Sequence, residues 1–118
     1  MADDPHDPQL LKGVLSLLLL HLLAERESYG YEIVQRLHSI GLNDVATGTV
    51  YPALSRLEKE RWLKARLVPS NEGPARKYYQ PTPVGLQALG AATSQWNSLV
   101  AVVARQLSRP ITTPPKGR

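Results

Sequence analysis

The 118-residue chain contains neither cysteine nor phenylalanine. Without cysteine it forms no disulfide and no thiolate zinc site, and nothing in it points to an oxidising compartment. Without phenylalanine its core is built mainly from leucine and valine, which is a thin core for a small domain. A thin core favours an oligomer that buries further apolar surface between subunits. The length corresponds to one domain plus an additional helix.

The chain also lacks a hydrophobic run long enough to cross a membrane. The apolar run from Val14 to Leu23 is shorter than the about 20 residues that a spanning helix needs, and His21 interrupts it. The residues before this run are acidic, whereas a secretory signal begins with a positive region. These features predict a cytoplasmic protein without a membrane partner.

Acidic side chains are scarce in the second half of the chain. Residues 61–118 carry nine basic side chains and one acidic one, whereas residues 1–60 carry nine acidic and five basic ones. Clustered cations beside a helix with a polar outer face indicate a polyanion as partner. A generally basic surface is the alternative interpretation.

The residue groups of common catalytic sites are missing as well. The chain has no glycine-rich phosphate loop and no serine–histidine–acid grouping that the layout would bring together, so we do not expect an enzyme. His6, His21 and His38 are scattered without carboxylates at ligand spacing. We therefore expect neither a metal site nor a cofactor.

Residues 47–59 predict an amphipathic helix. Its inner face consists of apolar residues at helical spacing, namely Val50, Leu54 and Leu57. The hydroxyl of Thr47 or Thr49 is expected to cap the first turn. The opposite face has hydroxyls at its start and cations further along, which suits the major groove of DNA. The alternative is the solvated face of an ordinary core helix.

Two more helices are predicted before this one. Residues 9–25 form a helix that is apolar almost all round, so it must be buried on two sides, one of them against a second subunit. Residues 30–40 form the next helix, and residues 41–46 form a short turn. Two helices, a turn and a third helix with a polar face are the helix-turn-helix layout.

Beyond Arg61 the periodicity changes to that of strands. Alternating apolar and basic residues at 63–67, a turn-forming cluster at 69–74 and a second run at 76–80 predict a β-hairpin, which in this place is a wing. Its cations are Lys64, Arg66, Arg76 and Lys77. They are placed to touch phosphates beside the groove or, alternatively, to keep exposed strand edges from aggregating.

The last helix is predicted to begin with Thr82 as cap and Pro83 as first residue, and to run to about Leu107. Apolar residues on it recur at close to heptad spacing and form a seam for a second helix. This apolar seam consists of Leu89, Trp96, Leu99 and Val103.

These patterns predict a mainly α fold with a small β-hairpin. The chain divides into a flexible leader (1–8), a winged helix-turn-helix DNA-binding domain (9–81), a C-terminal dimerisation helix (82–109) and a disordered tail (110–118).

Five blocks of the sequence match one known family. They read Leu-Leu-Lys-Gly at 10–13, Tyr-Gly-Tyr-Glu-Ile at 29–33, Thr-Gly-Thr-Val-Tyr-Pro-Ala-Leu-Ser-Arg-Leu-Glu at 47–58, Gly-Pro-Ala-Arg-Lys-Tyr-Tyr at 73–79 and Thr-Pro-Val-Gly at 82–85. In this order and spacing the blocks resemble the PadR family of bacterial transcriptional regulators, and the resemblance covers roughly residues 10–107. Tyr29, Ala75 and Pro81 depart from the family pattern, and the proline is expected to end the wing early.

The resemblance implies a winged-helix homodimer that binds a palindromic operator and usually represses transcription. It also implies that the first and last helices build the dimer. The single C-terminal helix is similar to the compact branch of the family, in whose multidrug-sensing members a tryptophan stacks on flat ligands at the dimer centre. Trp96 matches that position, which implies a small planar aromatic effector, although Trp96 as plain dimer core is the alternative. The rival function is a winged-helix dimer that binds a protein or a small molecule without binding DNA.

The candidate residues follow from the patterns and the resemblance together. The DNA-contact candidates are Tyr29, Thr47, Thr49, Tyr51, Pro52, Arg56, Lys59, Lys64, Arg66, Arg76, Lys77 and Tyr78. The dimer-interface candidates are Leu11, Leu15, Leu18, Leu89, Trp96, Leu99 and Val103, and the ligand-binding candidate is Trp96. Tyr79, on the opposite strand face from Tyr78, is expected in the core.

Overall fold

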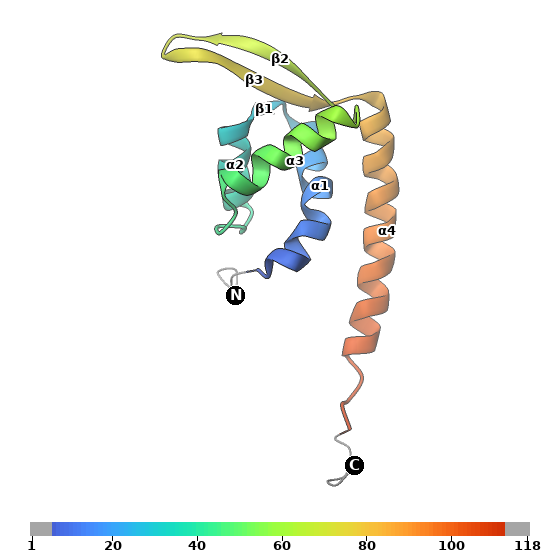
Figure 1. Cartoon of the computed structure of the whole chain (residues 1–118). Helices are drawn as coiled ribbons and strands as arrows, with labels where there is room; N and C mark the ends of the chain where they lie inside the picture. Colours follow the sequence, from blue (N-terminus) through green and yellow to red (C-terminus); the bar gives the residue numbers. More distant parts are fainter. Residues whose placement is uncertain (1–5, 113–118) are drawn as a thin grey trace.

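The computed structural model describes residues 6–112 of the chain. The elements in chain order are α1 (Pro8–Glu25), β1 (Ser28–Tyr29), α2 (Gly30–Ser39), α3 (Thr47–Lys59), β2 (Leu63–Ser70), β3 (Gly73–Pro81) and α4 (Pro83–Leu107). Helices α1, α2 and α3 form a helical head, the β2–β3 hairpin reaches out on one side of it, and α4 runs down the other side (Figure 1). The predicted helices are all present. Residues 1–5 of the predicted leader and 113–118 of the predicted tail lie outside the described part.

The two helices for which the sequence predicted a threonine cap differ at their N-termini. Thr82 caps α4 as predicted, because its hydroxyl accepts a hydrogen bond from the Gly85 N–H at 3.0 Å. The predicted threonine cap of α3 is wrong, because the capping residue is Ala46 and no side chain accepts there. Helix α3 therefore begins at Thr47 and contains Pro52 in its interior, where the missing N–H removes one helix hydrogen bond.

The sheet has three antiparallel strands in the order β1-β3-β2, one more than the hairpin that the sequence predicted. The extra strand, β1, pairs Ser28 with Tyr79 on β3. Arg36 of α2 holds β1 in place by donating to the Ser28 hydroxyl at 2.9 Å. The expected early end of the wing is wrong, because Pro81 still pairs with Leu63. As the last residue of its strand, Pro81 needs no further ladder donor.

The hydrophobic core lies between the helical head and the base of the sheet. It contains Leu19, Leu20, Leu23, Ile33, Leu37, Val50, Leu54, Leu57 and Leu63, all fully buried. Tyr79 also lies in this core, as expected, whereas Tyr78 is half-buried. Burial of so many leucines on three short helices fixes the orientation of α3.

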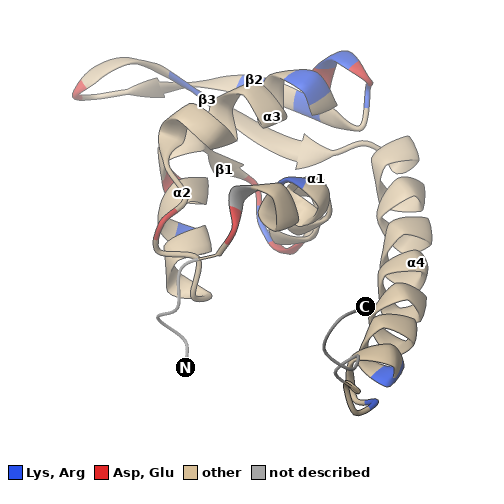
Figure 2. Cartoon of the chain, turned by 60° about the horizontal axis from the view of Figure 1, so that its bottom comes forward, with Lys and Arg blue, Asp and Glu red and all other residues tan. Residues whose placement is uncertain are grey.

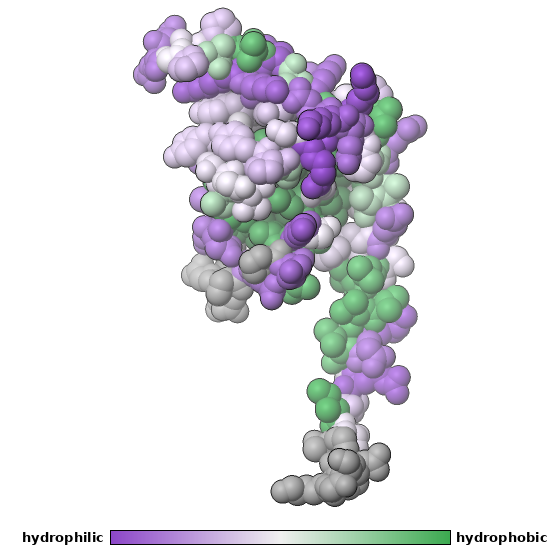
Figure 3. All heavy atoms as spheres, in the orientation of Figure 1, coloured by the Kyte–Doolittle hydropathy of each residue, from purple (hydrophilic) through white to green (hydrophobic). Residues whose placement is uncertain are grey.

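Helix α4 leaves most of its apolar surface uncovered. Leu89 packs against the core, but beyond it Trp96, Leu99 and Val103 are 42%, 55% and 43% exposed. Apolar side chains gather along this part of α4, away from the helical head (Figure 3). None of the helices in the described part is long and apolar enough to span a membrane.

Candidate nucleic-acid interface

The outer face of α3 is polar and open to solvent. Thr47, Thr49 and Pro52 are exposed near its start, and Lys59 is exposed at its end. The buried residues Val50, Ala53, Leu54 and Leu57 occupy the opposite face of the same helix. No side chain accepts a hydrogen bond from the first turn of α3, which is also the positive end of its helix dipole. A helix N-terminus alone is a weak site for an anion, so the neighbouring side chains decide whether an anionic partner can bind here.

The start of α3 meets the base of the wing through aromatic side chains. A Cβ added at Gly30 would lie 2.0 Å from Cε1 of Tyr51, so only glycine leaves room for this ring on α2. On the sheet, the Tyr29 and Tyr78 rings pack edge to face with their centroids 5.3 Å apart. The Arg76 guanidinium lies 4.5 Å from the centroid of Tyr29. Four sequence-predicted candidates from β1, α3 and β3 line one hollow of about 160 Å³, namely Tyr29, Tyr51, Arg76 and Lys77.

Two wing cations have carboxylate partners that the sequence analysis did not identify. Arg66 on β2 binds Glu27 through two hydrogen bonds, one of them from Nε at 3.1 Å. Lys77 on β3 binds Glu58 of α3, with 2.8 Å between Nζ and Oε1. The hydrogen bonds from Arg66 lower the pKa of Glu27, and the bond to Glu58 raises the pKa of Lys77. These two ion pairs tie the wing to the helical head.

The remaining candidate cations are distributed along one side of the molecule. Basic segments lie at the end of α3 and along the hairpin (Figure 2). Lys59 and Lys64 are exposed, and neither makes an ion pair within residues 6–112. They retain their full charge for an external anion, whereas Arg66 and Lys77 are partly neutralised by their partners.

Arg56 does not project straight out from α3. Its guanidinium turns toward α1 and donates a hydrogen bond to the Ser16 hydroxyl. A contact between Arg56 and a DNA base therefore requires the side chain to leave Ser16. No sequence pattern predicts this bond, because the two residues are 40 positions apart.

The predicted dimer-interface residues fall into two groups. Leu15 is 5% exposed and lies in the core of its own subunit, so it has little surface left for a partner. Leu11, Leu18 and Leu89 are half-buried against the core. Trp96, Leu99 and Val103 are exposed on α4, which leaves them free to contact a second chain.

A helix-turn-helix with an exposed polar third helix and an adjoining β-hairpin defines a winged-helix protein. The model of the transcriptional regulator PadR-like family matches residues 19–91. The chain belongs to the PadR family of transcriptional regulators, as the sequence motifs implied, and its winged-helix fold is confirmed. The members of this family are described as transcriptional regulators.

The chain is similar to several regulators from other organisms. A PadR-like transcriptional regulator from Bacillus cereus is 36% identical with a TM-score of 0.77, and the match covers 86% of this chain and 99% of that one. A Streptococcus transcriptional regulator is 37% identical with a TM-score of 0.77, covering 86% and 100%. The transcriptional regulator Rv3488 of Mycobacterium tuberculosis is 38% identical over 80 residues, which is 66% of this chain and 71% of the relative.

Proposed function

We propose that the protein binds a palindromic DNA operator as a homodimer and represses transcription. The observation that carries this proposal is the open polar face of α3 beside the base of the wing. Tyr51 and Arg76 lie on the two sides of this junction, so one duplex can contact both elements at once. A DNA duplex is a polyanion long enough to follow α3 and the hairpin together.

The contacts divide by chemistry. The hydroxyls of Thr47 and Thr49 and the first N–H groups of α3 suit phosphates at the edge of the groove. Lys59, Lys64 and Arg76 suit phosphates along α3 and the wing. The remaining proposed contacts are Tyr29, Tyr51, Pro52 and Tyr78, with Arg56 at a base edge once it leaves Ser16.

The exposed half of α4 supports a homodimer. Trp96, Leu99 and Val103 form an apolar seam whose burial against a second copy stabilises the pair. Leu11, Leu18 and Leu89 are half-buried within their own subunit and complete the proposed interface. A two-fold dimer would place its two α3 helices about one DNA turn apart, roughly 34 Å, and would therefore read two half-sites.

We further propose that a small planar aromatic effector stacks on Trp96 and releases the operator. The indole is 42% exposed on the apolar seam, so two copies would offer facing aromatic surfaces near the two-fold axis. In a variant with Trp62 replaced by tyrosine, a bound dye should quench the emission of Trp96. Unchanged emission across a panel of dyes, after correction for inner-filter absorption, would leave Trp96 as a packing residue.

The test of DNA binding is fluorescence anisotropy with a labelled duplex from upstream of the protein's own gene, measured at several salt concentrations. If several phosphates are neutralised, log Kd should change steeply with log salt, at about 0.9 per contact. A scrambled duplex of equal length and composition is the control. A flat salt response would favour a winged-helix dimer that binds a protein partner instead. Equal affinity for both duplexes would contradict recognition of a specific operator in this fragment.

A further inference from the structure

A histidine of α2 holds the turn that leads into α3. Nε2 of His38 lies 2.7 Å from the backbone carbonyl oxygen of Val45. A carbonyl oxygen only accepts hydrogen bonds, so Nε2 carries the hydrogen and donates it. The imidazole is half-buried between the two elements. This bond therefore joins the last turn of α2 to the residue two positions before the start of α3.

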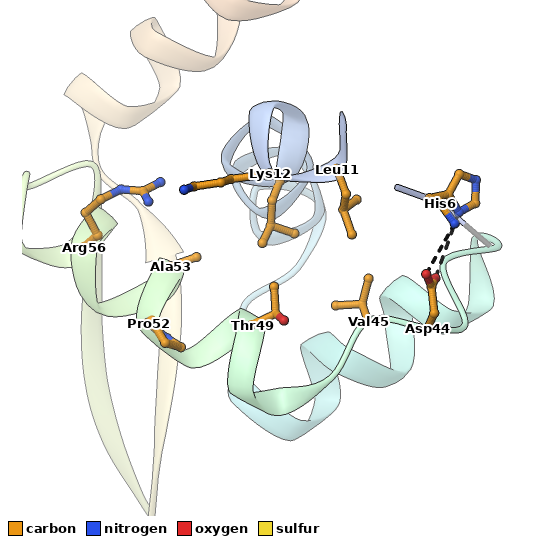
Figure 4. A pocket seen from close by; sticks show the side chains of 10 residues that line it. His6, Leu11, Lys12, Asp44, Val45, Thr49, Pro52, Ala53 and Arg56 are labelled. Carbon is orange, nitrogen blue, oxygen red and sulfur yellow. Dashed lines mark hydrogen bonds and ion pairs between the residues drawn. The ribbon is translucent and has the colours of Figure 1, made fainter. Parts of the chain in front are cut away.

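Val45 is an anchored point of the turn. The residue is 4% exposed and belongs to the hydrophobic core. Val45 and Thr49 line one cavity of about 550 Å³ between α1 and α3 (Figure 4). Among residues 6–112, His38 is the only hydrogen-bond partner of the Val45 carbonyl oxygen. Because the residue is buried, water replaces that donor poorly when it is lost.

The same carbonyl oxygen would be used if α3 began one residue earlier. In an α-helix each N–H donates to the carbonyl four residues back, so an earlier start needs a bond from the Thr49 N–H to Val45. In the structure the Thr49 N–H donates instead to the oxygen of Ala46, three residues back, at 3.0 Å. Ala46 is accordingly extended, with φ −115° and ψ 164°. By holding the Val45 oxygen toward α2, His38 keeps it away from the Thr49 N–H.

The residue at which α3 begins decides how its first turn is presented. Thr47 and Gly48 are the first two residues of the helix, and both are exposed. Adding Ala46 to the helix would change its backbone from extended to helical. Because Val45 is anchored in the core, that change would displace the first turn of α3 relative to the rest of the subunit.

We propose that His38 is a positioning residue for DNA binding, which acts by fixing the residue at which α3 begins. It acts through the Val45 carbonyl and not through a contact of its own with DNA. The effect on DNA binding rests on the proposed function, whereas the effect on the start of α3 does not.

The first experiment observes the start of α3 in the full chain without DNA. His38→Gln retains an N–H donor on a side chain of similar reach, whereas His38→Leu has no donor. In the NMR spectrum, the Cα chemical shift of Ala46 should move from the extended toward the helical range in His38→Leu and stay in place in His38→Gln. Identical behaviour of the two variants, whether both shifts move or neither does, would overturn the proposal.

The second experiment measures the operator Kd of the same variants by anisotropy. We expect His38→Leu to weaken binding about fivefold, the equivalent of one ordinary hydrogen bond, and His38→Gln to stay within about twofold of the wild type. An unchanged Kd in His38→Leu would overturn the effect on DNA binding.

His6→Leu is the matched control. The His6 ring also faces this turn, with Nδ1 4.0 Å from the Asp44 carboxylate, but within residues 6–112 it makes no hydrogen bond to the backbone of the turn. The same substitution at this histidine should therefore leave both the operator Kd and the Ala46 shift as in the wild type. Equal effects of His6→Leu and His38→Leu would count against a specific role of His38.

A second variant of α2 separates positioning from general stability. Ile33→Val removes one methylene from a fully buried side chain of the same helix, so it lowers the melting temperature while His38 and Val45 are kept. At a temperature well below the melting of every variant, its operator Kd should equal that of the wild type. Equal losses of affinity in Ile33→Val and His38→Leu would overturn the positioning role. If the wild type does not distinguish the operator from the scrambled duplex, the proposed function fails, and the Ala46 shift still decides whether His38 fixes the start of α3.

Discussion

The ion pair between Lys77 and Glu58 gives a sharp test of how the wing works. Lys77 has the sequence context of a phosphate contact, yet its ammonium lies 2.8 Å from the Glu58 carboxylate of α3. We predict that Lys77 positions the wing and does not itself bind phosphate. The two roles differ in what they do to the salt dependence of DNA binding.

The size of the effect follows from the exposure of the pair. The two side chains are 48% and 33% exposed, so water screens their attraction. Pairs of this kind contribute about 0.2–1 kcal/mol, which corresponds to a change in affinity of at most about fivefold per subunit. Lys77→Gln should therefore weaken operator binding modestly and leave the slope of log Kd against log salt nearly unchanged.

The matched control is Lys64→Gln on the neighbouring strand. Lys64 is exposed and has no ion-pair partner within residues 6–112. If it binds phosphate in both subunits of the proposed homodimer, its loss should lower the slope by about 1.8. The assay is anisotropy with one operator duplex at five salt concentrations for the wild type and each variant.

A charge swap completes the test. The double variant Glu58→Lys with Lys77→Glu rebuilds the ion pair with its charges exchanged, so it should recover most of the affinity lost in Lys77→Gln. If Lys77 contacts phosphate, the swap instead places a carboxylate against DNA and binding falls further. That further loss, or a slope change in Lys77→Gln equal to that of Lys64→Gln, would refute the positioning role.

The pH dependence of this pair has a definite sign. Its hydrogen bond to Glu58 raises the pKa of Lys77. A group whose pKa is raised on folding contributes fully below its usual value, about 10.4 for lysine, and loses the contribution as the pH rises through the folded value. The difference in operator affinity between wild type and Lys77→Gln should therefore stay constant from about pH 6 to pH 9.

Three further substitutions test the placement of α3 and α4. Gly30→Ala puts a Cβ 2.0 Å from the ring of Tyr51, so the ring must move; operator affinity should fall at least threefold while the melting temperature changes little. Gly85→Ala puts a Cβ 2.0 Å from a backbone carbonyl oxygen, which cannot swing aside, so we expect a loss of about 1–3 kcal/mol in the free energy of unfolding by denaturant titration. An unchanged stability would contradict that close approach. Leu99→Glu, on the exposed seam, should raise the dimer dissociation constant at least tenfold by sedimentation, whereas Gln87→Glu, on another face of α4, should not; equal behaviour of the two would count against the seam.

Some features of the site could be predicted from the sequence because they depend only on residues close together in the chain. The inner face of α3 follows from apolar spacing, and the start of α4 follows from Thr82 and Pro83. The alternation of the strand put Tyr78 and Tyr79 on opposite faces, and Tyr79 is the one in the core, as expected. Local physics fixed these features, so they needed no knowledge of the rest of the fold.

Other parts of the site depend on residues far apart in the chain. Glu27 meets Arg66 across 39 positions, Glu58 meets Lys77 across 19, and Arg56 meets Ser16 across 40. Strand β1 is only two residues long and carries no periodicity of its own. Residue spacing along the chain does not predict such pairs, because the register of the sheet and the packing of the helices determine which side chains come into contact.

The sequence by itself determined the winged-helix plan, its family and the residue types on the polar face of α3. Only the tertiary structure decided which cations are already partnered and which way Arg56 turns. The physical reason is the range of the interactions: periodicity and capping act within a few residues, whereas ion pairs and cavities form between surfaces that folding brings together.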